Sequence, residues 1–395
     1  MTEVATTVLI MCLALLVYTY AGYPALLWVF GRIAPKRVPS VTDAHDWPQI
    51  SISVPAYNEE TQIEELIKSL LALDYPKDRV QILVISDASS DRTDEIVGRY
   101  GEQGIELLRL EERGGKTKAE NAAAPHLTGE IIVNTDASIR IAPDAMKPLL
   151  AVFSDPAIGC ASGRDVSVSG KTATANAGES GYVGYEMAIR DLETRVHGIV
   201  GASGCFYAIR AHLHRLPLPE SLSRDFAAAL HTREHGYRPV SVNQAVCFVP
   251  RTPSLRKEYR RKVRTITRGM RTLWHKRALM NPFRFGWFSW MLLSHKVCRW
   301  ALPWGAALAG MSLVALSLSQ PLARALVAVG VVTVGLAGVG WAKADNGSVS
   351  KIFSVPAYVL AGNLAAAHAF LRAARGQKDA LWEPTRREVV TATSE

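Results

Sequence analysis

Acidic side chains in this 395-residue sequence stand where they could bind a charged ligand and move a proton. Asp87 and Asp136 each follow an apolar run typical of a buried strand, and Asp225 stands near the start of a predicted helix. A carboxylate is a hard oxygen ligand for Mg²⁺ or Mn²⁺, and it can take a proton from an attacking hydroxyl group. Taken singly, each residue is also typical of a helix cap or a turn. The interpretation of these residues as a binding and catalytic site therefore rests on their order along the chain.

The elements that would position these residues alternate between strand and helix patterns from residue 50 onward. The residue patterns predict strands at 50–54, 80–86, 105–110 and 130–135, and helices at 63–71, 91–100 and 118–124. This alternation predicts an α/β fold with a mostly parallel sheet and helices on both faces. Ligands bind such sheets beyond the carboxyl ends of the strands, which is where the polar residues stand.

Both ends of the chain carry apolar segments long enough to cross a membrane. Residues 4–31 are nearly all apolar and are followed by Arg32, Lys36 and Arg37, so the positive-inside rule places the next domain in the cytoplasm. Three more spans are predicted at 297–318, 322–342 and 353–373. Four spans would leave the basic C-terminal tail outside, so an arrangement with one apolar segment lying in the membrane plane stays open.

A basic segment at 256–277 accounts for the whole net charge of +9, because it holds ten Lys or Arg residues and one glutamate. Charge confined to one segment beside apolar spans favours anionic lipid head groups over nucleic acid as the partner. Apolar residues recur here at helical spacing, which predicts an amphipathic helix at the membrane interface. A helix whose charged face is simply solvated is the alternative.

These patterns divide the chain into five predicted parts. They are an N-terminal transmembrane helix (1–38), a cytosolic catalytic α/β domain (39–252), amphipathic interfacial helices (253–295), three C-terminal transmembrane helices (296–375) and a tail (376–395). The prediction is a multi-pass protein of the inner, or plasma, membrane with its catalytic domain in the cytoplasm.

Five separated motifs resemble, in the same order, those of the family 2 glycosyltransferases with a GT-A (Rossmann-like) fold. The matching segments are 55–60 (PAYNEE) and 86–91 (SDASSD) for the nucleotide loops, 134–138 (NTDAS) for the DxD, 201–210 for the acceptor loop and strand, and 224–226 (RDF) for the base. Further on, 260–265 (RRKVRT) stands at the place of the QxxRW motif. The layout of spans resembles hyaluronan, chitooligosaccharide and other polysaccharide synthase-type enzymes.

The resemblance implies an inverting transfer of sugar from a nucleotide sugar, with a UDP-sugar as the expected donor and a β-linkage in the product. It implies Asp225 as the catalytic base and Asp136 as the ligand of Mg²⁺ or Mn²⁺. The implied nucleotide-sugar contacts are Ala56, Tyr57, Glu59, Asp87, Lys116, Asp136 and Arg264, and the implied acceptor contacts are Gly204, Cys205 and Arg261.

The sequence departs from the family pattern in three places. Ser138 replaces the second acid of the DxD, and Arg224 replaces the first residue of the acidic pair before the base. Only Arg264 remains of QxxRW, where Arg261 and Thr265 replace the glutamine and the tryptophan. That motif accompanies processive synthesis in the family, so processivity is left open. Arg261 and Arg264 also suit contact with lipid head groups.

Two versions of the function remain at this point. One is polysaccharide or oligosaccharide assembly, and the other is transfer of a single sugar to a lipid-linked or oligosaccharide acceptor. A nucleotide-sensing transporter is disfavoured because the C-terminal spans are almost purely apolar. A nucleotidyltransferase is disfavoured because the first strand ends in PAYNEE, which is not a glycine-rich phosphate loop.

Overall fold

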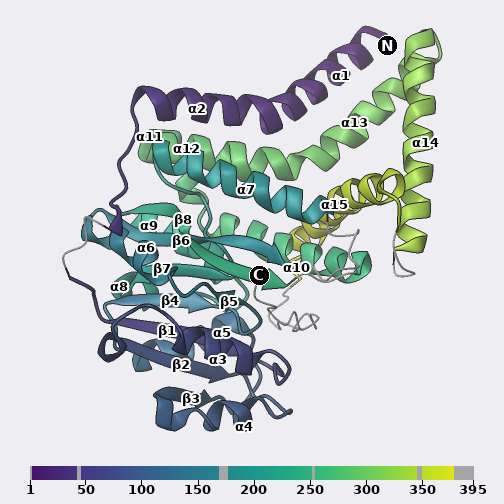
Figure 1. The fold of residues 1–395 in the computed structure, drawn as a ribbon. Coiled ribbons are helices and arrows are strands. Elements are labelled where there is room, and N and C mark those ends of the chain that lie inside the picture. The colour runs from purple at the N-terminus through teal and green to yellow at the C-terminus, as the bar shows by residue number, and fades with distance from the viewer. Residues whose placement is uncertain (1, 42–45, 169–176, 251–253, 345–348, 378–395) are drawn as a thin grey trace.

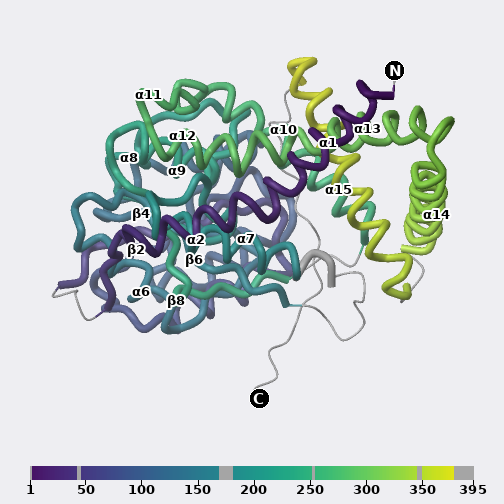
Figure 2. The backbone as a smooth tube through the Cα atoms, turned by 90° about the horizontal axis from the view of Figure 1, so that it is seen from above, coloured from purple at the N-terminus to yellow at the C-terminus, as the bar shows by residue number. Residues whose placement is uncertain are grey.

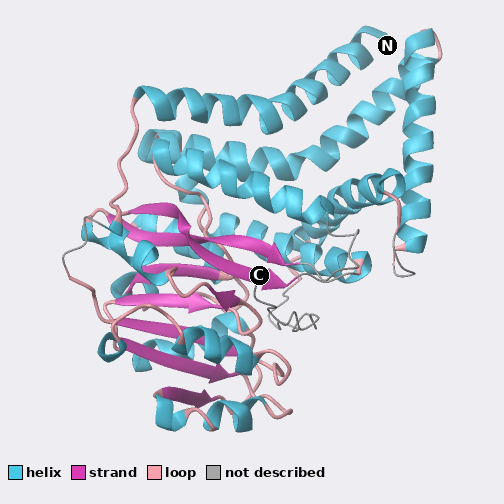
Figure 3. Ribbon diagram, in the orientation of Figure 1, coloured by secondary structure: helices cyan, strands magenta, loops and turns pink. Residues whose placement is uncertain are grey.

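An eight-stranded sheet forms the centre of the α/β domain, and helices cover both of its faces (Figures 1 and 3). The computed structural model describes residues 2–41, 46–168, 177–250, 254–344 and 349–377. The strands are β1 (Ile50–Ala56), β2 (Val80–Ser86), β3 (Ile105–Arg109), β4 (Ile131–Thr135), β5 (Arg140–Ile141), β6 (Ile158–Val168), β7 (Phe206–Arg210) and β8 (Arg238–Pro250).

The strand order is β3-β2-β1-β4-β7-β6-β8-β5. The first four strands are parallel, β7 runs antiparallel between β4 and β6, and β6 pairs with β8 in parallel. The mostly parallel α/β sheet predicted from the sequence is therefore confirmed. All residues of β1 and β4 are buried, as expected for central strands covered on both faces.

The first half of the domain matches the predicted elements closely. The predicted helices appear as α3 (Ile63–Leu71), α4 (Thr93–Gly98) and α5 (Lys116–Ala123). α3 forms because Ile63, Leu66, Ile67 and Leu70 recur on one face, and all four are buried. In the second half, β7 lies within the segment 201–210 that the family resemblance marked as loop and strand, whereas β6 and β8 were not predicted.

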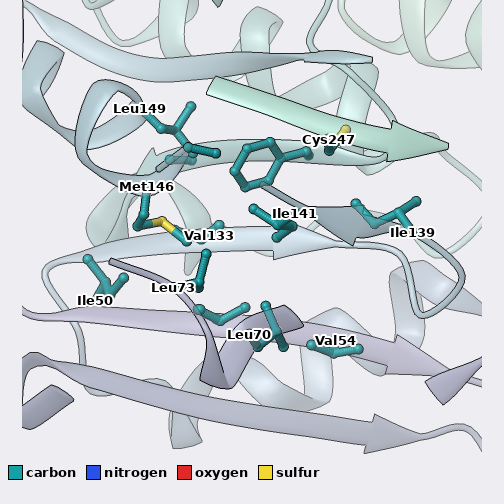
Figure 4. Close-up of a cluster of buried hydrophobic side chains, with 14 of the residues drawn as sticks. Ile50, Val54, Leu70, Leu73, Val133, Ile139, Ile141, Met146, Leu149 and Cys247 are labelled. Carbon is teal, nitrogen blue, oxygen red and sulfur yellow. The ribbon is translucent and has the colours of Figure 1, made fainter. Parts of the chain in front are cut away.

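Two apolar clusters hold the sheet, one on each face. Figure 4 shows the first, in which side chains from β1 and β4 meet α3 and α6 (Met146–Ala151), with Cys247 of β8 beside them. The second cluster packs α5, α8 (Ala211–His214) and α9 (Arg224–Glu234) on the opposite face. Each fully buried aliphatic side chain contributes roughly 1.5–3 kcal/mol. The carboxyl ends of the parallel strands are thus fixed by packing on both faces.

A third apolar cluster joins the catalytic domain to a layer of helices. It combines α2 (Tyr23–Ile33), α7 (Ala177–Val196), α9, α10 (Leu255–His275), α11 (Pro282–Phe285) and α12 (Trp287–Leu292). Tyr23, Leu27 and Phe288 are completely or almost completely buried in it. In Figure 1, α7 lies between the sheet and the helices α2 and α12.

Four helices are long and apolar enough to cross a membrane. The first, Thr2–Ile33, comprises α1 (Thr2–Val17), η1 (Tyr18–Gly22) and α2. The second, Trp287–Ser317, comprises α12, η9 (Leu293–Cys298) and α13 (Arg299–Ser317). The other two are α14 (Pro321–Lys343) and α15 (Lys351–Ala374). The second begins about ten residues before the predicted span at 297, because α12 and η9 continue into α13 without a break. Figure 2 shows α14 and α15 beside the domain, whereas α2 crosses over it.

Candidate functional site

The loops after β1 and β2 form one hydrogen-bonded unit. The backbone amide of Glu59 donates to Thr93 Oγ1 (2.8 Å), and the amide of Ser90 donates to Asn58 Oδ1 (2.8 Å). Asn58 and Ala88 adopt φ angles of 51° and 56°. Residues other than glycine rarely take this conformation, and it clusters at ligand-binding loops. The first two predicted nucleotide loops are therefore held against each other at the carboxyl edge of the sheet.

Asp87 fastens the glycine loop that precedes α5. Its Oδ1 and Oδ2 accept hydrogen bonds from the backbone amides of Gly114 (2.8 Å) and Gly115 (2.7 Å). Hydrogen bonds to a charged acceptor are the strong ones, and Gly115 has a φ of 86° that favours glycine. Asp87 is therefore not a helix cap, whereas Asp91 accepts the amide at the start of α4 as a cap does. The loop delivers Lys116 to the sheet edge.

Lys116 links the predicted donor residues to the predicted acceptor residues. Its Nζ lies 2.5 Å from Asp136 Oδ1 and donates to the carbonyl oxygen of Gly204 at 3.0 Å. The backbone amide of Asp136 in turn donates to the carbonyl oxygen of Cys205 (3.2 Å). The side chains of the ion pair are each 18% exposed, which leaves them within reach of a ligand.

Asp225 lies in the first turn of α9 and faces the same glycine. A Cβ atom on Gly204 would lie 2.9 Å from Asp225 Oδ2, so a larger residue there would require this carboxylate to shift. Ser223, the N-cap residue of α9, donates from Oγ to Asp225 Oδ1 at 2.5 Å. The N-cap alternative for Asp225 therefore does not hold. Lys116 and Asp225 thus both approach Gly204, and Asp136 joins them through its ion pair with Lys116.

Arg224, which stands where the family has an acid, pairs with Glu120 of α5. Its Nε lies 3.4 Å from Glu120 Oε2, and its Nη1 donates to the carbonyl oxygen of His214 (3.0 Å). The two side chains are 7% and 0% exposed. This buried pair joins the helix that carries Lys116 to the helix that carries Asp225, so it fixes their relative position.

The pKa shifts show that these charges interact. Burial alone lowers the pKa of Lys116, but the carboxylates of Asp136, Glu120 and Asp225 outweigh it and raise that pKa above its ordinary value. Burial raises the pKa of Glu120, against the opposing effect of Lys116 and Arg224. Lys116 therefore stays protonated at neutral pH and compensates the carboxylates around it.

Tyr57 lies beneath a guanidinium group on the nucleotide side of the site. The Arg113 guanidinium carbon is 3.9 Å from the centroid of the Tyr57 ring, a cation–π contact. Ala56, the last residue of β1, is buried, and its carbonyl oxygen accepts the backbone amide of Asp87 (2.9 Å). Arg113 was not predicted as a site residue, although it directly precedes the glycine pair that Asp87 holds.

The segment that resembles QxxRW lies on α10. Arg261 forms a two-pronged pair with Glu258 (2.7 Å to each oxygen), and Arg264 lies one turn further along the helix. Arg268 reaches the site region, because its Nη2 donates to Thr117 Oγ1 (2.9 Å) and to the carbonyl oxygen of Leu222 (2.5 Å). Arg268 is a supporting residue that the sequence did not reveal.

Comparison with known proteins identifies the part of the chain that carries this arrangement. Residues 51–214 match the family Glycosyl transferase family 2. This segment is a glycosyl transferase family 2 domain. The domain contains all the predicted donor residues except Arg264, and it ends before Asp225.

Two curated relatives and one solved structure are similar to the chain. An N-acetylglucosaminyltransferase of Rhizobium sp. (strain N33) is 28% identical over 40% of this chain, and a beta-monoglucosyldiacylglycerol synthase of Trichormus variabilis is 32% identical over 44% of it. The chain spans 36% of the length of each relative. The mannosyltransferase PcManGT from Pyrobaculum calidifontis, solved with GDP-Man and Mn²⁺, has 23% identity and a TM-score of 0.71 over 94% of this chain and 100% of that chain. That likeness confirms the GT-A fold.

The residues of the family 2 domain fit a divalent cation shared with substrate phosphates. Asp136 offers hard carboxylate oxygens, and a cationic group, Lys116 Nζ, already lies against Oδ1. Mg²⁺ is commonly held by one or two carboxylates together with water and phosphate. A separate group with metal-ligand spacing among the described residues, His231, Glu234 and His235, lies at the other end of α9, where Lys276 pairs with Glu234.

Proposed function

We propose that the protein is a membrane-anchored inverting glycosyltransferase that passes a sugar from a nucleotide sugar to an acceptor hydroxyl group. The proposal rests on one observation: Lys116 and Asp225 both approach Gly204, and Asp136 forms an ion pair with Lys116. A nucleoside diphosphate leaves with developing negative charge, and an acceptor hydroxyl is a weak nucleophile until a base takes its proton. The site offers a cation for the first requirement and a carboxylate for the second.

In this mechanism the acceptor oxygen attacks the anomeric carbon while the bond to the diphosphate oxygen breaks. Asp225 takes the acceptor proton, and the Ser223 hydroxyl group holds the carboxylate in position. Lys116 supplies positive charge near the diphosphate. A single displacement inverts the anomeric carbon, so an α-linked UDP-sugar gives a β-linked product.

A divalent cation fits the same scheme. Asp136 would hold Mg²⁺ or Mn²⁺, which supplies charge neutralisation to the diphosphate when bound. Ala56, Tyr57, Glu59 and Asp87 would shape the nucleotide side, and Gly204 and Cys205 the acceptor side. Arg261 and Arg264 remain proposed contacts at the acceptor and the diphosphate.

The acceptor is proposed to be a glycan at the cytoplasmic face of the plasma membrane. In one version it is a growing poly- or oligosaccharide, as in polysaccharide biosynthesis, and in the other it is lipid-linked. The lipid-linked version is favoured by a set of charged and aromatic side chains that connects the candidate spans to the predicted base. Membrane lipids then act both as surroundings and as acceptor.

Incubation of the purified protein with a panel of nucleotide sugars tests the proposal. Release of a nucleoside diphosphate together with a glycosylated product supports it, whereas release of pyrophosphate points to a nucleotidyltransferase. Asp136→Ala is expected to weaken metal-dependent donor binding, and Asp74→Ala, which removes an exposed carboxylate paired with Lys147, is the matched control. Equal donor binding in both variants would contradict the assigned role of Asp136.

A further inference from the structure

Three cationic side chains, one from α10 and two from the continuous helix formed by η9 and α13, lie beside the N-terminal half of α7. Arg299 Nη1 of α13 lies 2.6 Å from Glu186 Oε2 and 3.1 Å from the Tyr182 hydroxyl group. Lys296 Nζ of η9 lies 3.5 Å from Glu186 Oε1. Lys262 Nζ of α10 lies 5.9 Å from the centroid of the Tyr182 ring. We call Lys262, Lys296 and Arg299 the cation cluster.

The cation cluster faces one carboxylate and several aromatic rings. Glu186 pairs with Lys296 and Arg299, and its Oε1 also lies 3.0 Å from His295 Nε2. His295 Nδ1 and the Tyr23 hydroxyl group each lie 2.6 Å from Oε1 of Glu193, the next acid on the inward side of α7. Rings of Tyr182, Tyr185 and Tyr358 lie 3.8–5.9 Å from cluster cations.

The cluster connects the predicted base to the candidate membrane helices. Lys296 Nζ lies 5.7 Å from the ring centroid of Phe226, the residue after Asp225. A Cβ atom on Gly201, in the predicted acceptor loop, would lie 3.2 Å from Phe226 and 3.6 Å from Lys296 Cε. Lys296 and Arg299 belong to the candidate span Trp287–Ser317, and Lys262 lies against Tyr358 of α15. The cluster thus sits between the acceptor side of the site and the apolar helices.

We propose that the cation cluster binds the phosphate group of a lipid-linked acceptor and so presents the acceptor hydroxyl group to Asp225. Guanidinium and ammonium groups are the usual protein partners of phosphate, and cations close to a bilayer attract anionic lipids. Tyrosine rings suit the boundary between an apolar tail and a polar head. The inference rests on the proposed transferase function and specifies its acceptor as a phosphate-bearing lipid rather than a neutral glycan.

Lipid binding by the full-length protein tests the proposal directly. The protein is placed in phosphatidylcholine nanodiscs and titrated with phosphatidic acid, with diacylglycerol carrying the same chains, and with inorganic phosphate. Phosphatidic acid is expected to bind at least about tenfold more tightly than diacylglycerol, and inorganic phosphate is expected not to displace it at equal concentration. Equal binding of diacylglycerol overturns the proposal in favour of a neutral acceptor. Displacement by inorganic phosphate overturns it in favour of a free-anion site.

Variants identify the cluster as the binding group. Lys296→Gln and Lys262→Gln are each expected to weaken phosphatidic acid binding about tenfold, whereas Arg260→Gln, on an exposed position of the same helix as Lys262, should not. Lys262→Gln leaves the Glu186 pairs intact, so it keeps the test meaningful if Lys296→Gln fails to fold. Unchanged binding in Lys262→Gln, or an equal loss in Arg260→Gln, overturns the proposal.

Donor binding in the same nanodiscs separates this inference from the proposed function. A cluster variant that loses phosphatidic acid but keeps its affinity for the nucleotide sugar supports the assignment. If the wild-type protein binds no nucleotide sugar while it still selects phosphatidic acid, the transferase proposal fails and the lipid-phosphate site stands. If it binds the nucleotide sugar without selecting phosphatidic acid, only the present inference fails.

Discussion

The proposed donor half of the site, which contains Asp87, Lys116 and Asp136, differs from the helical layer beside it in how far apart along the sequence the contacting residues lie. On the donor side, Lys116 and Asp136 are 20 residues apart, and Asp87 and Gly114 are 27 apart. In the helical layer, the Tyr23 hydroxyl group reaches Glu193 across 170 residues. Both regions use buried charged groups. In the proposed donor half the partners come from neighbouring elements of the chain, whereas in the helical layer they come from segments far apart in the sequence.

This difference explains what each region contributes. In the donor half, parallel strands bring successive loops to one edge, so function follows from residues placed directly after each strand. In the helical layer, charged side chains are satisfied only when segments from both ends of the chain have packed together. A buried charge without its partner is costly, so these contacts couple the candidate spans to the catalytic domain.

Replacement of the proposed base gives the largest expected effect. Asp225→Asn should reduce turnover by about 10²–10⁴-fold, because the amide cannot take the acceptor proton. Donor affinity should stay near the wild-type value, since the side chain keeps its size and can still accept a hydrogen bond from Ser223. Product formation at saturating donor, together with calorimetric donor binding, measures the two effects.

Ser223→Ala is the matched control for that experiment. It removes the hydrogen bond to Asp225 but leaves the carboxylate, so turnover should fall far less than in Asp225→Asn. Near-normal turnover in Asp225→Asn would show that another group accepts the proton.

The second largest effect is expected when Asp87 can no longer hold the glycine loop, and this change should lower donor affinity alone. Asp87→Asn leaves only one oxygen to accept the amides of Gly114 and Gly115. Donor affinity is expected to fall roughly 10- to 100-fold, because a hydrogen bond to a charged group contributes about 1.5–3 kcal/mol. Calorimetric titration with the nucleotide sugar measures it, with Asp74→Asn as a surface control. A loss of phosphatidic acid binding in Asp87→Asn would contradict the separation of the two regions.

The sequence predicted the strands and helices around Asp87, Lys116 and Asp136 well because their signals are local. Short apolar runs such as residues 131–133 of β4 and the one-sided helix α3 reveal both the elements and the loop residues between them. β6 escaped prediction because only its first six residues are buried, and Gly163 interrupts its pattern for a close approach to Phe206. The pairing of Arg224 with Glu120 and the contacts of Arg268 depend on tertiary packing, which no periodicity encodes.

A smaller effect is expected where the helical layer supports the catalytic domain. Arg268→Met keeps much of the side-chain length but loses the hydrogen bonds to Thr117 and to the carbonyl oxygen of Leu222. The segment before α9 should loosen, so we expect about tenfold lower turnover and about 1–3 kcal/mol lower stability. Initial rates and thermal unfolding measure both, and the exposed Arg260→Met serves as the control. Unchanged turnover would show that α10 does not position Asp225.

The smallest expected effect is a pH dependence at the contact between α9 and the segment after α10. Burial, followed by the nearby Lys276 ammonium, lowers the pKa of His231 to about 4. The unfolded chain, with an ordinary histidine pKa of about 6.5, then binds the proton more tightly than the folded protein between these values. Stability is therefore full above about pH 6.5 and falls as the pH drops toward about 4, by at most about 3 kcal/mol.

His231→Gln should flatten this part of the stability profile, and His235→Gln, one helical turn away, should leave most of it in place. Thermal unfolding between pH 7 and pH 4 in matched buffers measures the difference between the two variants, with the wild-type protein as reference. Because Lys276 Nζ also pairs with Glu234 (2.5 Å), Lys276→Met should raise the pKa of His231 toward its ordinary value and so make the loss of stability at low pH smaller. A profile that is the same in His231→Gln and wild type would mean that the acid sensitivity arises elsewhere in the protein.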